Sequence, residues 1–86
     1  MTNAEDPKIQ FYEEVEAGKL SLQDTVRGMR KILKMTQTEY ATLVGVAPRI
    51  IIDLERGVAN PTLKTLEKIG RPFRLKINFR RIDGAL

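Results

Sequence analysis

Residues 36–57, TQTEYATLVGVAPRIIIDLERG, contain two short helical patterns separated by a glycine. Thr36 is followed three residues later by Glu39, which is the capping-box pattern that opens a helix. This pattern predicts a helix over about 37–44. Gly45 suits the left-handed position at which such a helix ends.

A second helix follows after a two-residue connector. Pro48 suits the first turn of a helix and Gly57 suits its end, so we expect this helix to span 48–56. The apolar residues expected to pack the two helices onto a core are Tyr40, Ala41, Val46, Ile51 and Leu54. This is the layout of a helix-turn-helix, in which the outward face of the second helix fits the major groove of DNA.

Three further helices are expected around this motif. The first spans 7–18, with apolar residues at helical spacing: Ile9, Tyr12 and Val15. The second spans about 21–34 and has one apolar face: Leu22, Val26, Met29 and Leu33. The last has Asn60 as its cap and Pro61 at its first position, ends at Gly70, and faces inward with Leu63, Leu66 and Ile69.

The hydrophobic period changes after Pro72. Residues 73–80, FRLKINFR, alternate apolar and polar, which is the pattern of a half-buried strand. A lone strand leaves its backbone groups unpaired, so we expect it to pair with the same strand of a second copy; a frayed basic tail is the alternative. The expected dimer contacts are the apolar positions of the strand: Phe73, Leu75, Ile77 and Phe79.

The expected fold is therefore all-α, with five short helices and one C-terminal strand that pairs across a homodimer. A chain of 86 residues is long enough for one domain, which we expect to span 1–86. Within it, the helix-turn-helix core is expected to span 21–70, flanked by the first helix and the strand.

Composition excludes several classes of function. The chain has no cysteine and no histidine, which removes thiol and imidazole catalysis and any Cys/His zinc site. We expect no enzyme activity, no metal and no cofactor. No apolar run approaches the roughly 18 residues that span a bilayer, and the polar first ten residues are unlike a signal peptide, so we expect a cytoplasmic protein without membrane contact.

Charge is distributed unevenly along the chain. Residues 1–18 hold five acidic residues and one basic residue, whereas residues 19–86 hold 14 basic and six acidic residues. A basic body favours a polyanionic partner such as nucleic acid. The acidic first helix either packs on the domain through its apolar residues or docks a cationic partner.

Residues 30–73 closely resemble the XRE/Cro/C1-type helix-turn-helix family of phage repressors and bacterial regulators. The matching pieces occur in the family's order: TQTEYA, LVGV, IDLERG and NPTLKTL. With the expected strand, the layout is most similar to the small HipB-like antitoxin members. The resemblance implies a lambda-repressor-like core that binds a double-stranded DNA operator as a dimer and represses transcription, often of its own operon.

The resemblance also implies which residues contact DNA. Gln37 matches a residue that touches a phosphate, and Arg49 would donate two hydrogen bonds to guanine O6 and N7. The outward recognition positions are Pro48, Arg49, Ile52 and Asp53. Contacts to the phosphates beside the groove are expected from Arg56, Asn60, Thr62 and Lys64. Arg30 and Glu55 match the family's internal ion pair.

The chain departs from the family at Pro48, Ile50 and Ile52, where polar residues are usual. Ile50 and Ile52 either contact thymine methyl groups or meet a protein partner. The second alternative, together with the acidic first helix, favours an antitoxin that binds a toxin protein and autoregulates its operon. A third possibility is a degenerate motif that makes protein contacts only.

Overall fold

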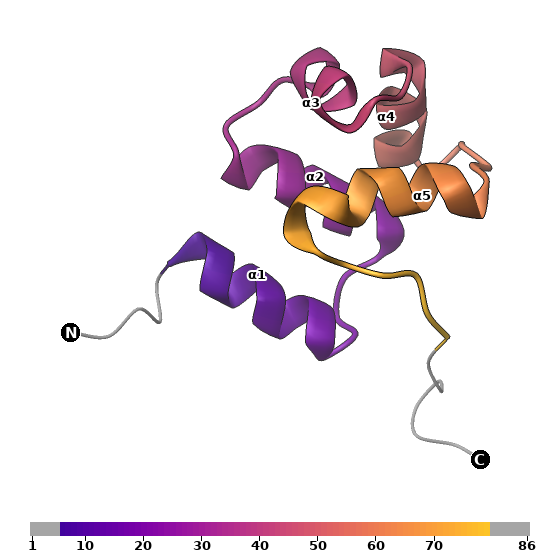
Figure 1. Ribbon diagram of the computed structural model, residues 1–86. Coiled ribbons are helices and arrows are strands. Elements are labelled where there is room, and N and C mark those ends of the chain that lie inside the picture. Colours follow the sequence, from indigo (N-terminus) through magenta and orange to yellow (C-terminus); the bar gives the residue numbers. More distant parts are fainter. Residues whose placement is uncertain (1–5, 80–86) are drawn as a thin grey trace.

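The computed structural model describes residues 6–79, and the regular elements among them are helical (Figure 1). The elements in chain order are α1 (Pro7–Glu16), α2 (Leu22–Ile32), α3 (Gln37–Val44), α4 (Pro48–Arg56), α5 (Leu63–Gly70) and the 3₁₀ turn η1 (Arg71–Phe73). The five expected helices are confirmed. Between residues 6 and 79 there is no β-strand, and no helix there is long and apolar enough to cross a membrane.

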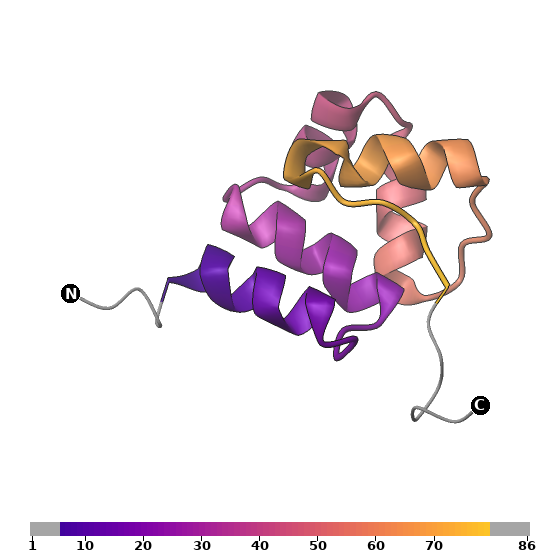
Figure 2. The same cartoon turned by 60° about the horizontal axis from the view of Figure 1, so that its bottom comes forward.

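The central helix is α2. In both views it lies between α1 on one side and the α3–α4 pair on the other (Figures 1 and 2). Helix α4 packs against both α2 and α3. The helix-turn-helix is thus attached to the rest of the molecule through α2, while α1 lies on the far side of α2.

The ends of α3 follow from its sequence. The Glu39 backbone N–H donates to Thr36 Oγ1 at 3.1 Å, and the Thr36 N–H donates to Glu39 Oε1 at 2.8 Å, which completes the expected capping box. Gly45 ends the helix with φ of 80°. Because only glycine adopts this left-handed conformation without steric cost, Gly45 sets the turn into α4.

Helix α5 begins later than its sequence predicts. Its cap is Thr62, whose Oγ1 accepts the Thr65 N–H at 3.1 Å, so the assignment of Asn60 as the cap is wrong. Both residues have capping side chains, but Thr62 directly precedes the first helical residue and its hydroxyl reaches the third amide of the helix. Leu63, expected inside, is 58% exposed, whereas Ile69 is buried.

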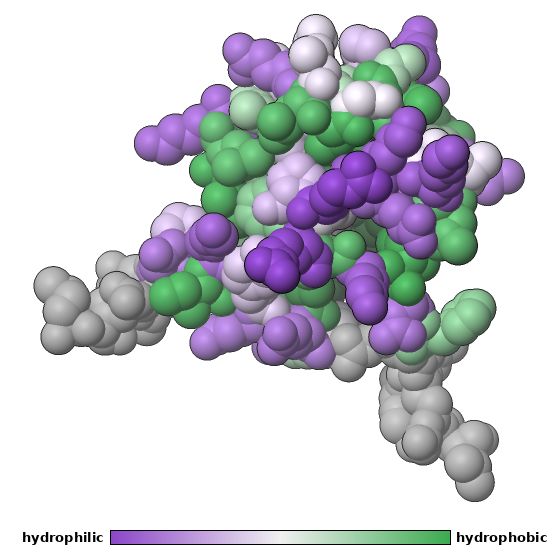
Figure 3. All heavy atoms as spheres, in the orientation of Figure 1, coloured by the Kyte–Doolittle hydropathy of each residue, from purple (hydrophilic) through white to green (hydrophobic). Residues whose placement is uncertain are grey.

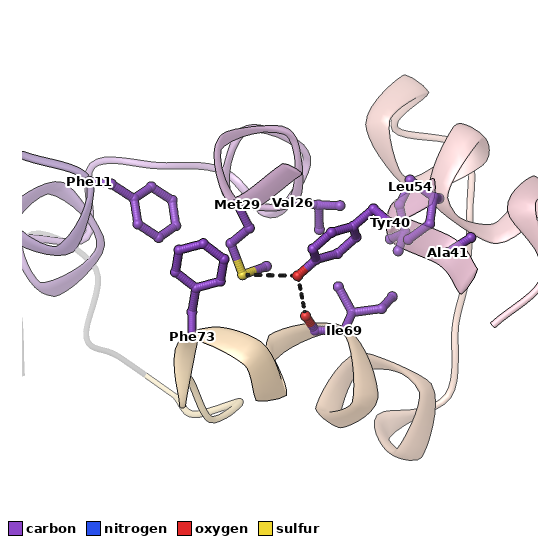
Figure 4. Packing of buried hydrophobic residues seen from close by; sticks show 9 residues of the cluster. Phe11, Val26, Met29, Tyr40, Ala41, Leu54, Ile69 and Phe73 are labelled. Atoms are coloured by element: carbon purple, nitrogen blue, oxygen red, sulfur yellow. Dashed lines mark hydrogen bonds between the residues drawn. The ribbon is translucent and has the colours of Figure 1, made fainter. Parts of the chain in front are cut away.

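The core is closed around Tyr40, which is fully buried. Its hydroxyl donates to the Ile69 carbonyl oxygen at 2.7 Å and lies 3.7 Å from Met29 Sδ (Figure 4). Burial raises the pKa of Tyr40 to about 12. The buried apolar residues of the described chain are Phe11, Val26, Met29, Tyr40, Ala41, Ile51, Leu54, Ile69 and Phe73.

Helix α1 packs through Phe11 in addition to two of the three residues expected. Phe11 is 5% exposed, whereas Ile9 is 38% exposed and outside the core. Tyr12 and Val15 pack against the core as expected. Phe11 and Val15 are four residues apart and lie on one helix face, which leaves Ile9 at its margin. The acidic helix therefore packs on the domain, as the first alternative predicts.

Two expected core positions of α2 lie at its ends and are exposed. Val26 and Met29 are buried, but Leu22 is 42% exposed and Leu33 is 39% exposed. Leu22 is the first helical residue, and Leu33 follows the last one. Burial on this face is therefore limited to the middle turns of the helix.

The strand expected over 73–80 is wrong at its start. Phe73 is the last residue of η1 and is buried with its ring 5.6 Å from that of Phe11, in an edge-to-face arrangement (Figure 4). Arg74 then adopts φ of 57°, which is left-handed and incompatible with a strand. Residues 75–79 have no regular secondary structure, and residue 80 lies outside the described part of the chain.

Phe73, expected at a dimer contact, is buried within the domain itself, and Leu75 is partly packed there as well. Phe73 is 3% exposed, and Leu75 is half-buried against the core. The physical reason is the aromatic pocket offered by α1, which a local alternation pattern does not reveal. Ile77 and Phe79 remain exposed, at 47% and 99%.

Candidate nucleic-acid interface

Helix α4 is fixed by the residues expected to fix it. Ile51 and Leu54 are 0% and 2% exposed, and Val46 packs half-buried against the core. Tyr40 and Ala41 of α3 are also buried. Because one side of α4 is taken up by this packing, its opposite side is presented outward, as a reading helix requires.

The outward side of α4 carries a cluster of charged residues. Pro48 and Arg49 are exposed in the first turn, and Arg56 is exposed at the end. Asp53 lies between the two arginines, with Oδ1 at 3.8 Å from Arg49 Nη1 and 3.9 Å from Arg56 Nη1. The structure thus brings together three of the expected contact residues, with the Arg49 side chain 71% exposed.

The isoleucines beside the core position are less exposed than a docking surface requires. Ile50 is half-buried and packs against the core, and Ile52 is half-buried on the outward side. Only part of the Ile52 side chain is therefore accessible to a DNA groove. Ile50 contributes to fixing the helix instead.

A buried carboxylate ties α4 to two other helices. Glu55 Oε2 accepts from Arg30 Nε and Glu55 Oε1 accepts from Arg30 Nη2, both at 2.8 Å, so the expected ion pair is present and bidentate. The Glu55 side chain is only 4% exposed and that of Arg30 17%. Gln37 Nε2 also donates to Glu55 Oε1, at 3.2 Å. Gln37, expected at a phosphate, is thus half-buried and anchored to the end of α4.

The charge of Glu55 is balanced by its neighbours. Burial raises the pKa of Glu55, but the hydrogen bonds from Arg30 and Gln37 and the charges of Arg30 and Arg27 outweigh it, so the pKa is lowered overall. The pKa of Arg30 is raised in turn, chiefly by its hydrogen bond to Glu55. The carboxylate therefore stays ionised where it holds the helices together.

Arg27 is a positioning residue that the sequence reasoning missed. Its Nη2 donates to the Glu55 carbonyl oxygen at 2.7 Å, at the C-terminal end of α4, where a cation is favourable. Its Nη1 lies 3.0 Å from Asp24 Oδ1. The signal was available, because Arg27 and Arg30 are three residues apart and share one face of α2.

The start of α5 and the loop before it supply the remaining expected contacts. Asn60, Thr62 and Lys64 are all exposed. The Thr62 hydroxyl is engaged as the helix cap, whereas the exposed Lys64 forms no ion pair within residues 6–79. Figure 3 shows hydrophilic side chains across the part of this face where α5 runs, flanked by hydrophobic ones. The Thr65 amide is taken by the Thr62 cap, so the first-turn amides of α5 that suit contact with phosphate are those of Leu63 and Lys64.

Comparison with known proteins matches this architecture. The model of the Helix-turn-helix family matches residues 26–79, which include α3, α4 and α5. Two proteins of Archaeoglobus fulgidus, each described as an uncharacterized HTH-type transcriptional regulator, are 44% and 42% identical over 52 residues. These alignments cover 60% of this chain and 73% and 74% of the relatives. No solved structure matches significantly.

The family match covers more than half of the chain, and its bounds include every buried contact that fixes α4. The chain therefore belongs to the XRE-type helix-turn-helix family.

Proposed function

We propose that this protein is a sequence-specific DNA-binding transcriptional regulator that places α4 in the major groove. The observation that carries the proposal is the exposed Arg49 on a helix whose other side is fixed by Ile51, Leu54 and the Glu55 ion pair. A base-reading side chain needs such a rigid support, because specific hydrogen bonds require a defined orientation.

The division of roles among the contact residues follows from their placement. Arg49 donates to a guanine edge, and Ile52 contacts a neighbouring thymine methyl group. Arg56, Lys64 and the amides at the start of α5 contact phosphates, which position the helix without reading sequence. Gln37 acts through Glu55, because its amide already donates to that carboxylate.

We further propose that the protein binds its operator as a homodimer and represses transcription. Residues 75–79 form one wall of an apolar groove of about 920 Å³ between the end of α1, α2 and α5. Ile77 and Phe79 on this wall are exposed, and a second copy is the partner that would cover them. Two copies would place their reading helices in successive major grooves, about 10–10.5 base pairs apart.

The two features that suggested a toxin-binding role are packed against the domain. Ile50 packs against the core and Ile52 is half-buried, so they do not form an exposed docking surface. The acidic α1 packs on the domain through Phe11. Both observations favour DNA binding over toxin binding as the role of this surface.

The test is selection from a randomised duplex library, followed by affinity measurement on the selected site. We expect a palindromic site, and Arg49→Ala should lose about 1–3 kcal/mol of discrimination at one base pair in each half-site. Lys64→Ala is the matched comparison: it should weaken binding to all duplexes alike and reduce the salt dependence. Binding that depends on salt but on no sequence contradicts the proposal.

A further inference from the structure

A half-buried carboxylate lies between two exposed arginines on the outward side of α4. Asp53 Oδ1 is 3.8 Å from Arg49 Nη1 and 3.9 Å from Arg56 Nη1. The Asp53 side chain is 28% exposed, against 71% for Arg49 and 64% for Arg56. The same oxygen thus faces both guanidinium groups. Of the three side chains, that of Asp53 is the least exposed and so has the least freedom to move.

Helix stability does not explain the Arg49–Asp53 pair. Arg49 is in the first turn, where the helix dipole disfavours a cation, and Asp53 is in the last turn, where it disfavours an anion. The basic residue also precedes the acidic one by four positions, which is the weaker orientation of such a pair. Only Arg56 is placed favourably. Because the Arg49–Asp53 pair opposes the helix dipole, a role in ligand binding explains it better than a role in helix stability.

A carboxylate on a DNA-reading surface has two physical effects. It repels phosphates, and so weakens binding to any duplex regardless of sequence. It also restrains the guanidinium beside it, and a restrained arginine loses less conformational freedom when it donates to a base. The first effect lowers the affinity for all duplexes alike, and the second raises the ratio of specific to non-specific affinity.

We propose that Asp53 is a positioning residue that determines specificity: it holds the Arg49 guanidinium for a guanine edge, while its charge weakens the attraction to phosphates of every duplex. This inference rests on the proposed function, because it presupposes that α4 reads DNA. It assigns to Asp53 no base contact of its own. Arg56, on the other side of the carboxylate, balances its charge when the helix is in the groove.

The experiment compares wild type with Asp53→Asn, which has the same shape and no charge. Affinities are measured for the selected duplex, for its single-base variants and for an unrelated duplex at one salt concentration. We expect Asp53→Asn to bind the unrelated duplex roughly five-fold more tightly. Discrimination should fall about ten-fold, at the base pair that Arg49→Ala identifies.

A double-mutant cycle isolates the coupling. If Asp53 acts through Arg49, the Arg49→Ala/Asp53→Asn variant should discriminate no worse than Arg49→Ala alone. The control is Glu13→Gln, which removes an equal charge from the exposed side of α1, away from α4. It should leave both affinities unchanged. Thermal unfolding of each variant verifies that it is folded.

Three outcomes overturn the inference. Discrimination that Asp53→Asn leaves intact shows that the carboxylate does not position Arg49. A loss at a different base pair from that of Arg49→Ala shows that Asp53 reads a base directly. If wild type itself discriminates no sequence, the proposed function fails and this inference fails with it.

Discussion

Tyr40 is the largest fully buried side chain between residues 6 and 79, and it makes a hydrogen bond across the core. Its hydroxyl donates to the Ile69 carbonyl oxygen at 2.7 Å. Tyr40→Phe leaves that buried acceptor unpaired and should lower the free energy of unfolding by about 1–3 kcal/mol, as measured by urea denaturation. Tyr12→Phe, which loses a half-buried bond to the Phe73 carbonyl oxygen, should cost less. A Tyr40→Phe protein as stable as wild type contradicts this account of the core.

The sequence predicts that Tyr40 is buried but not what its hydroxyl contacts. Its position within the helical pattern places it on the inner face, and that pattern is local. The acceptor is 29 residues away, and no periodicity links two such positions. The same holds for Gln37: its place at the start of α3 is predictable, whereas its bond to Glu55 depends on how α3 crosses α4.

At the scale of elements, the turn between α3 and α4 depends on backbone conformation alone. Gly45 has φ of 80°, and a Cβ added there meets no atom within 4 Å. Gly45→Ala should therefore lower the free energy of unfolding by roughly 1–2 kcal/mol through left-handed strain without any clash. Gly45→Asn should cost less, since asparagine tolerates this conformation better. Equal losses for the two variants, measured by thermal unfolding, contradict a purely conformational role.

The stability that Glu55 gives to the junction of α2, α3 and α4 should depend on pH. Because the folded pKa of Glu55 is lowered, its stabilising contribution is full above its unfolded value of about 4.3 and is lost as pH falls through its folded value. Glu55→Gln leaves Arg30 without its charge partner, and should lower stability at pH 7 by about 3–5 kcal/mol. The difference between wild type and variant should shrink as the pH falls below about 4. A difference independent of pH in denaturant unfolding would contradict this network.

The beginnings and ends of the helices were largely predictable, because caps are local chemistry. Thr36 with Glu39, and Pro48 at the start of α4, marked α3 and α4 correctly. The start of α5 was not predictable in this way. Asn60 and Thr62 both have capping side chains, and only tertiary packing selects between them. Local signals therefore suffice where one cap is present and fail where two compete.

At the scale of the whole molecule, the first helix is joined to the last turn by aromatic rings. Phe11 lies 5.6 Å from Phe73, and Tyr12 lies 6.1 Å from it, by ring centroids. Phe73→Ala should lower the free energy of unfolding by about 3–5 kcal/mol, because it leaves a cavity between α1 and η1. Denaturant unfolding and sedimentation together test this. A variant of unchanged stability that changes only its oligomeric state would restore Phe73 as a dimer contact.

The burial of Phe73 could not be predicted from the local sequence pattern. Alternation over 73–80 fits a strand, but a buried site beside Phe11 is available and outweighs the local pattern. The reading helix was predictable, because its apolar positions, proline and glycine lie within one short stretch. The Arg49–Asp53–Arg56 cluster was predictable only as spacing, since the distances depend on side-chain conformations.

The most direct test of the central claim is chemical-shift mapping of the isotope-labelled protein titrated with the selected duplex. The account predicts that backbone amides over 48–57 and in the first turn of α5 shift most, and that those of α1 stay unchanged. Shifts confined to α1 and residues 75–79, with α4 unaffected, would contradict the assignment of α4 as the DNA-reading helix.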